Sequence, residues 1–248
     1  MSGRVEVLFL GAGDAFCSGG QHQAGYVLRG EGATLLLDCG ATSLAALHRH
    51  EVDAAALDGI FLSHLHGDHF GGLPFLFLEW IYRTKRSRPV EVIGPPGTAE
   101  RVTTLFRTLY RDVGHRPVPF DLRFREVHPG GTVEIAGIVL EAFRVPHQQE
   151  EISLGVAVQI GSRRIVYSGD TGWTDDLLCQ SAGADLFICE CSFFDTIVPN
   201  HLAYVTLEGV RSRFESRRII LTHLGQEVLD RRAEVTMELA FDGLRVSL

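Results

Sequence analysis

His64-Leu65-His66-Gly67-Asp68-His69 places four potential metal ligands within six residues. The stretch follows the apolar run Gly59-Ile60-Phe61-Leu62-Ser63, which predicts a buried strand, so the four side chains are expected on the loop where that strand ends. Neutral imidazole and carboxylate are the usual ligands of zinc, iron and manganese. One tetrahedral ion does not need four ligands from a single loop, and the stretch therefore indicates two ions side by side.

Three further potential ligands directly follow strand-like runs much later in the chain: His147, Asp170 and His223. Any one of them alone is more typical of a hydrogen-bonded structural histidine or of a Gly-Asp turn. Strand ends meet at one edge of a sheet, however, so segments that are distant in sequence can gather there. Seven ligands would give each of two ions three of its own, with one carboxylate bridging and room left for a shared water.

The composition is that of an ordinary globular protein, with 248 residues, 45% hydrophobic and 22% charged. The formal net charge of −8 argues against a general nucleic-acid coat. Basic residues do gather between Arg83 and Arg125, where a solvated surface with ion pairs is the expected reading. The five cysteines fit no paired zinc module, and no apolar run approaches the ~18 residues that span a bilayer. We therefore expect a cytoplasmic protein with reduced thiols and no membrane contact.

Short strand-like runs alternate with helix-like runs along the whole chain, and no linker, low-complexity segment or short repeat interrupts them. Many strands with helices in each half predict two mixed β-sheets packed face to face with helices outside, an α/β fold in one domain over residues 1–248. Near the end of the chain we expect a helix over Leu229–Leu239 and a turn at Asp242-Gly243.

The order His-x-His-x-Asp-His, then His, then Gly-Asp, then His resembles the metallo-β-lactamase superfamily from Leu8 to His223. The resemblance implies a four-layer αββα sandwich with the metals at one edge. Matched motif by motif, it assigns the ligands of one ion, those of the other and the bridge in turn: His64, His66 and His147; Asp68, His69 and His223; and Asp170.

Two further features are similar to the ribonuclease Z-type branch of that superfamily. Glu190 lies in the run Leu186–Phe194, and His201 follows it, which implies that Glu190 orients His201 and that His201 protonates the leaving oxygen or steadies the phosphate. The branch usually shows His-Ser-Thr where this chain has His201-Leu202-Ala203. Only 22 residues separate His147 from Asp170, too few for the long arm of the tRNA-processing members, which argues against whole tRNA precursors as substrates.

The resemblance implies a metal-dependent phosphodiesterase with two divalent ions, zinc first and manganese or iron as alternatives. A water between two such ions would ionise near neutral pH, and the bridging hydroxide would attack phosphorus. The expected catalytic residues are Asp68, Glu190 and His201, and the substrate is a small phosphodiester or an RNA end. Asp14, Asp38 and Thr222 are positioned to hold the ligand histidines. The apolar run Leu73–Leu78 would suit a homodimer interface or a pocket wall.

Two other functions are compatible with the same fold. One is a lactonase or β-lactamase type of carbon–oxygen or carbon–nitrogen hydrolase, and the other is a catalytically silent binding protein. The pair Glu190 and His201 favours phosphorus, because phosphodiester cleavage gains from an acid at the leaving oxygen. The presence of all seven ligand residues argues against a silent protein.

Overall fold

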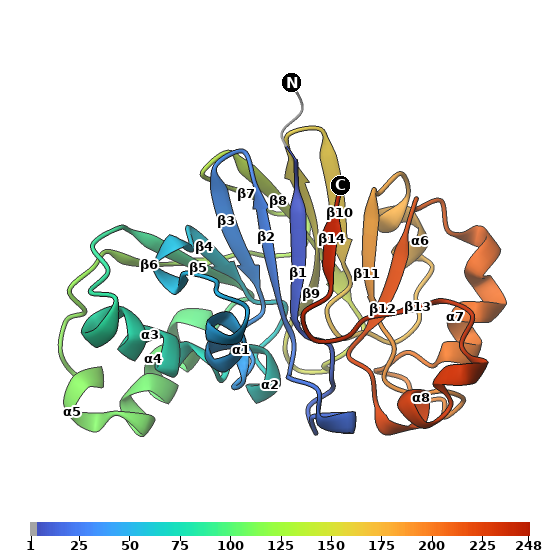
Figure 1. Ribbon diagram of the computed structural model, residues 1–248, viewed down its shortest axis with the longest axis horizontal. Helices are drawn as coiled ribbons and strands as arrows, with labels where there is room; N and C mark the ends of the chain where they lie inside the picture. Colours follow the sequence, from blue (N-terminus) through green and yellow to red (C-terminus); the bar gives the residue numbers. More distant parts are fainter. Residues whose placement is uncertain (1–3) are drawn as a thin grey trace.

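Two mixed β-sheets pack face to face in the computed structural model, which describes residues 4–248; residues 1–3 of the domain predicted over 1–248 lie outside the described part. Each sheet has seven strands within the described residues, and helices cover both outer faces (Figure 1). This arrangement confirms the predicted αββα sandwich. In Figure 1, helices α1 to α5 flank one sheet and helices α6 to α8 flank the other.

The strands of the first sheet lie in the order β14, β1, β2, β3, β4, β5, β6. Their bounds are β14 Arg245–Ser247, β1 Glu6–Gly11, β2 Gly25–Gly30, β3 Ala33–Leu37, β4 Gly59–Phe61, β5 Val90–Gly94 and β6 Leu122–Glu126. The second sheet has the order β13, β12, β11, β10, β9, β8, β7. Its bounds are β13 Glu238–Leu239, β12 Ile219–Thr222, β11 Leu186–Glu190, β10 Arg163–Tyr167, β9 Ser153–Ile160, β8 Ile138–Val145 and β7 Thr132–Ile135.

The helices follow the strands as connections on the outer faces, and the longest of them, α4, has 12 residues. Their bounds are α1 Ser43–Arg49, α2 Gly67–Phe70, α3 Leu73–Leu78, α4 Thr98–Leu109, α5 Arg111–Gly114, α6 Asp176–Ser181, α7 Tyr204–Val210 and α8 Gln226–Asp230. Among residues 4–248, no helix has the length and apolar character needed to cross a membrane.

Strand β1 shows why the central strands are continuous apolar runs in the sequence. Val7 and Phe9 belong to the core between the two sheets, whereas Leu8 and Leu10 belong to the core between the first sheet and its helices. Successive side chains of a strand point to opposite faces, so a strand covered on both faces needs apolar residues at every position. A third apolar cluster fills the space between the second sheet and its helices.

The predicted helix over Leu229–Leu239 is wrong. Helix α8 ends at Asp230, and Glu238–Leu239 forms β13, paired in parallel with β12. Val235, Met237 and Leu239 alternate in sequence and pack against the outer core of the second sheet. This period of two residues is typical of a strand, and pairing with β12 outweighs the helical propensity of the segment.

The chain topology brings several strand ends to one edge of the molecule. Strands β10, β11 and β12 are parallel neighbours, and β8 runs in the same direction as β10 because both are antiparallel to β9. The two sheets meet at this edge, where the Leu154 amide donates to the Ser63 carbonyl oxygen over 2.9 Å. Gly169, two residues after the end of β10, has φ +61°, and a Cβ there would lie 2.6 Å from the Leu154 oxygen, so only glycine fits this crossing.

Arg86 departs from the surface expected for the basic stretch. It is buried, lies 4.9 Å from the ring centroid of Trp80, and donates four hydrogen bonds of 2.6–2.9 Å. The acceptors are the backbone carbonyl oxygens of Ala55, Leu57, Arg88 and Pro89. Arg86 therefore joins the loop after α1 to the start of β5 through its guanidinium.

We expect Arg86→Met to lower the free energy of unfolding by about 3 kcal/mol, because buried carbonyl groups lose charged donors. Urea denaturation followed by circular dichroism measures this loss. Arg83→Met is the matched control, since Arg83 is exposed and pairs with Glu79 across one helical turn, and it should cost less than about 1 kcal/mol. Equal effects of the two substitutions would contradict the structural role of Arg86.

Candidate metal centre

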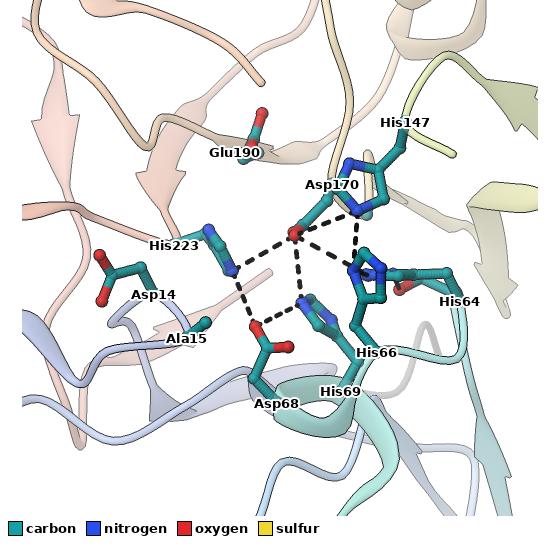
Figure 2. A network of polar contacts seen from close by, with 12 residues as sticks. Asp14, Ala15, His64, His66, Asp68, His69, His147, Asp170, Glu190 and His223 are labelled. Carbon is teal, nitrogen blue, oxygen red and sulfur yellow. Dashed lines mark hydrogen bonds and ion pairs between the residues drawn. The ribbon is translucent and has the colours of Figure 1, made fainter. Parts of the chain in front are cut away.

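All seven side chains expected as metal ligands meet where the two sheets join (Figure 2). Four of them come from the stretch after β4, whose loop carries His64 and His66 and whose helix α2 carries Asp68 and His69. The others come from the second sheet: His147 follows β8, Asp170 follows β10 and His223 follows β12. The sequence prediction that strand ends bring these residues together is therefore correct in position.

His64, His66 and His147 form the first group. The His66 Nδ1 atom lies 3.1 Å from His64 Nε2 and 3.0 Å from His147 Nε2. Three ring nitrogens thus converge on one point, and they come from two different sheets. In a neutral ring, His66 Nδ1 can form one hydrogen bond, either with His64 or with His147. The other close nitrogen–nitrogen contact is then left without a hydrogen bond.

Asp68, His69, His223 and Asp170 form the second group. The Asp68 Oδ2 atom lies 3.3 Å from His69 Nε2 and 3.3 Å from His223 Nε2. Asp170 Oδ2 lies at the same distance, 3.3 Å, from each of these two nitrogens. Two carboxylate oxygens and two imidazole nitrogens therefore alternate around a small ring.

Asp170 lies between the two groups. Its Oδ2 atom is 3.9 Å from His64 Nε2 and 3.9 Å from His147 Nε2, in addition to its contacts in the second group. Figure 2 shows this oxygen at the centre of the network, with dashed lines to histidines on both sides. The position is the one that a bridging carboxylate would occupy.

The residues present fit divalent ions on three counts. Zinc–nitrogen bonds of about 2.05 Å give tetrahedral edges of about 3.3 Å, close to the separations within both groups. His69 Nε2 and Asp170 Oδ1 are buried without a hydrogen-bond partner. Within residues 4–248, no lysine or arginine is recorded in an ion pair with Asp68 or Asp170, although buried carboxylates need compensating positive charge.

The electrostatics of the site point the same way. Burial lowers the pKa of His64 well below its ordinary value, which leaves this ring neutral with a free lone pair. Burial also lowers the pKa of His69, but the carboxylates of Asp170 and Asp38 outweigh it and raise that pKa well above the ordinary value. The same balance, with Asp170 as the main raising charge, brings the pKa of His223 to about 9. The carboxylates thus draw positive charge into the site, and a divalent cation supplies such charge.

Asp38 fixes one ligand histidine from behind. Its Oδ2 atom accepts from His69 Nδ1 over 2.8 Å, from Ser63 Oγ over 2.7 Å and from Tyr167 Oη over 2.7 Å, and its Oδ1 atom accepts from the Ser63 amide over 2.7 Å. The prediction that Asp38 holds a ligand histidine is confirmed by this contact. The hydroxyl of Tyr167 could not be anticipated, because it reaches Asp38 across the interface between the sheets.

The other two predicted histidine partners are wrong. Asp14 accepts from the amides of Phe16 and Ser18, so it shapes its own loop and contacts no ligand histidine. Thr222 Oγ1 pairs with Tyr26 Oη at 2.9 Å in the core. Thr222 precedes His223 directly, but adjacent residues of a strand point to opposite faces, so its side chain enters the core instead.

Glu190 and His201 lie against the second group, as the resemblance implied. The buried Glu190 Oε1 accepts a hydrogen bond from His201 Nδ1, and Glu190 Oε2 accepts from the Leu202 amide over 2.8 Å. Burial raises the pKa of the Glu190 carboxyl. Burial lowers the pKa of His201, but the Glu190 hydrogen bond and charge raise it above the ordinary value. Glu190 therefore fixes the ring of His201 through Nδ1.

A cavity of about 500 Å³ is lined by residues of both ligand groups and by His201. Residues that the sequence reasoning missed line part of it, among them Phe16, Ser192 and Phe193. Ser192 Oγ lies 2.9 Å from His223 Nδ1 and 3.0 Å from Glu190 Oε1, which links the metal group to the acid pair. The only sequence signal for Phe16 is an aromatic residue shortly after the glycine-containing stretch Gly11-Ala12-Gly13-Asp14.

The sequence matches the family described as "Anti-Pycsar protein Apyc1" over residues 5–242. The chain belongs to this family. It is a ribonuclease Z-like member of the metallo-β-lactamase superfamily, as its motif order indicated. The Apyc1-family match covers every residue discussed in this site, from Asp14 to His223.

Several known proteins are similar to this Apyc1-family chain. Ribonuclease Z of Methanosarcina acetivorans is 25% identical, over 91% of this chain and 89% of its own length. The crystal structure of the short form of human tRNase Z has a TM-score of 0.79 and 27% identity, with 97% of this chain and 98% of that one covered. The metallo-β-lactamase fold protein YhfI from Bacillus subtilis also has a TM-score of 0.79, with 19% identity over 99% of this chain and 100% of its own, and shows the fold alone.

We expect Asp170→Asn to remove most of the divalent metal from the purified protein, because the charge that lies between both groups is lost. Elemental analysis of the dialysed protein measures bound metal per chain. Asp175→Asn, a change of an exposed carboxylate that pairs with Arg213, should keep the wild-type metal content. Full metal content in Asp170→Asn would contradict the central place given to Asp170.

Proposed function

We propose that this chain is a dinuclear metal-dependent phosphodiesterase that cleaves a small cyclic or linear phosphodiester. One ion, zinc in the first place and manganese or iron otherwise, would be held by each of the two ligand groups, with Asp170 shared between them. The observation that carries the proposal is the position of the Glu190–His201 pair beside this shared carboxylate. Ligand atoms of Asp170, Glu190, His201 and His223 all lie within 4.8 Å of one another.

When bound, two divalent ions supply an ionised water as the nucleophile and neutralise the charge of the phosphate oxygens. The chain itself orients the ligands and excludes water behind them. His64 and His69 are fully buried, and Asp68 reaches both nitrogens of the second group from the first turn of α2. Asp68 and Asp170 together supply the negative charge that makes the site select cations.

His201 supplies the acid. Glu190 accepts from Nδ1, which leaves Nε2 of the same ring toward the cavity that His201 lines. Because the pKa of His201 is raised by Glu190, the ring holds a second proton at Nε2 over a wider range of pH. Transfer of the Nε2 proton to the leaving oxygen, as the phosphorus–oxygen bond breaks, yields an alcohol and a neutral imidazole that still donates to Glu190.

Three features support a small substrate. The cavity of about 500 Å³ is within the usual range for small-molecule sites. Residues between His147 and Asp170 are used by β9, β10 and their turns, so the described chain has no protruding arm at the place where the tRNA-processing branch carries one. Five of the ten basic residues between Arg83 and Arg125 are held in ion pairs, such as Arg88 with Asp58 and Arg125 with Glu91, and Arg86 is buried, which reduces the positive charge free to contact an RNA.

Phe16 supports a substrate with a flat apolar part, such as a nucleobase. Its side chain is 88% exposed and lines the cavity, so an apolar ring faces the space that a substrate would enter. The loop below it is rigid, since Asp14 accepts from the Phe16 and Ser18 amides over 3.1 and 3.0 Å. A fixed loop that presents an exposed ring provides a stacking surface at little entropic cost.

A carbon–oxygen or carbon–nitrogen hydrolase of the same fold is less well supported. The buried Glu190 has no function in activating a metal-held water, whereas it has a clear one in holding an acid for a phosphate leaving group. The similarity to ribonuclease Z of Methanosarcina acetivorans and to human tRNase Z also favours phosphorus chemistry.

We expect His201→Ala to slow cleavage of an alkyl phosphodiester by roughly a hundredfold, because the leaving alkoxide loses its acid. Bis(4-nitrophenyl) phosphate, whose leaving group needs no proton, should be affected much less. Steady-state kcat values for both substrates measure the difference, and His128→Ala, which changes an exposed histidine of a distant loop, is the control. An equal loss on both substrates would remove the acid role from His201.

We expect Phe16→Ala to raise KM for a nucleotide phosphodiester by about tenfold while kcat changes little, because one stacking contact is lost. A methyl phosphodiester of similar charge should show no such change. Tyr82→Ala, which removes an exposed aromatic ring from a different surface, is the matched control. An unchanged KM for the nucleotide would exclude Phe16 from substrate binding.

A further inference from the structure

The histidine rings of the site are not all held in the same way. Four of the five candidate ligand histidines turn Nε2 toward the site and contact a fixed partner through Nδ1, at 2.8–3.0 Å. These four histidines and their partners are His64 with Ser63 Oγ, His69 with Asp38 Oδ2, His147 with the Asn200 carbonyl oxygen, and His223 with Ser192 Oγ. Each partner can accept, so each can hold the hydrogen on Nδ1 and keep the Nε2 lone pair free.

His66 is reversed. It turns Nδ1 toward the other two nitrogens of its group, and its Nε2 lies 3.0 Å from the side-chain nitrogen of Gln148. His66 is also the one exposed ring of the three, so the surrounding core does not fix it. Gln148 is therefore the one side chain recorded in contact with the outer nitrogen of this ring among the described residues.

Gln148 is itself held at both ends of its amide. Its Oε1 accepts from the buried Ser153 Oγ over 3.1 Å, and its Nε2 donates to Glu151 Oε2 over 3.3 Å. Glu151 Oε1 accepts from Arg101 Nη1 over 2.7 Å, and Arg101 Nη2 donates to the Leu65 carbonyl oxygen over 2.9 Å. The contacts form a closed circuit from α4 through the loop before β9 and back to the residue next to His66.

The orientation of this amide determines which ring nitrogen of His66 carries the hydrogen. With Gln148 Nε2 facing the ring, His66 Nε2 accepts, and the ring hydrogen must sit on Nδ1, where it blocks the lone pair. With the amide turned over, Gln148 Oε1 accepts from His66 Nε2–H, and the Nδ1 lone pair is free for a cation. The turned amide keeps Ser153 as a partner, because its nitrogen then donates to Ser153 Oγ, a hydroxyl that can accept as well as donate. It loses the bond to Glu151 Oε2, so the Glu151 carboxylate must move away from Gln148 Oε1.

We propose that Gln148 is a positioning residue that selects the tautomer of His66, and that its amide turns over when His66 Nδ1 binds a divalent cation. The Ser153 hydroxyl holds Gln148 within reach of the ring in both orientations, whereas Glu151 holds the amide only before it turns. Glutamine suits this position because one side chain offers a donor and an acceptor in the same place. The inference rests on the metal assignment of the proposed function.

The test compares zinc affinity among variants, measured by competition with a chromophoric chelator. Gln148→Met keeps the length of the side chain and removes both polar atoms, and we expect it to weaken binding of one zinc ion by about tenfold or more. The double variant Q148E/E151Q keeps the net charge and places a permanent acceptor at the ring, and it should bind zinc at least as tightly as wild type. Gln149→Met, a change of the exposed neighbour, should bind like wild type.

A second readout reports the ring directly. The two-bond proton–nitrogen spectrum of the zinc-loaded protein should show His66 bound through Nδ1 with hydrogen on Nε2 in wild type and in Q148E/E151Q, and a mixture in Q148M. Zinc affinity of Q148M within twofold of wild type would overturn the proposal, as would equal weakening in Q148M and in the double variant. Wild-type protein that binds no zinc would instead overturn the metal assignment itself, so the two failures are distinguishable.

Discussion

One carboxylate oxygen, Oδ2 of Asp170, lies 3.3 Å from the ring nitrogens of His69 and His223 and 3.9 Å from those of His64 and His147. Four imidazoles and a buried negative charge in so small a space are unfavourable unless positive charge is shared among them. The negative charge of the carboxylates raises the pKa values of His69 and His223, and it favours the binding of a cation at the site. The rest of the edge is built to keep these groups in place.

In the sandwich, the residues that stabilise the fold are different from those that hold the candidate ligands in position. Apolar side chains on both faces of strands such as β1 stabilise the two sheets, so the strand ends are free to carry polar residues. Behind the ligands, Asp38 joins Ser63, His69 and Tyr167 in one buried network across both sheets. Such satisfied polar networks rigidify their members, which keeps the ligand rings in position before an ion arrives.

The two sides of the site differ in character. On the side of the second group, Glu190, His201 and the exposed ring of Phe16 face a cavity suited to a small molecule. On the side of the first group, His66 lies near the surface and depends on Gln148, which is held by a circuit of side chains between α4 and the loop before β9. The proposed acid and substrate contacts thus lie on one side of the site, whereas the contacts that orient His66 lie on the other.

The sequence by itself determined the strands, the two-sheet fold and the positions of the seven candidate ligands, together with the partnership of Glu190 and His201. These features have local signatures: apolar runs, turn residues and metal-binding side chains at strand ends. Only the tertiary structure decided that Gln148 and Tyr167 contact the site, that Asp14 and Thr222 do not hold its histidines, and that Glu238–Leu239 is a strand. The reason is physical, because a hydrogen bond or strand pairing between distant segments depends on how the sheets pack, which leaves no periodic pattern in either segment.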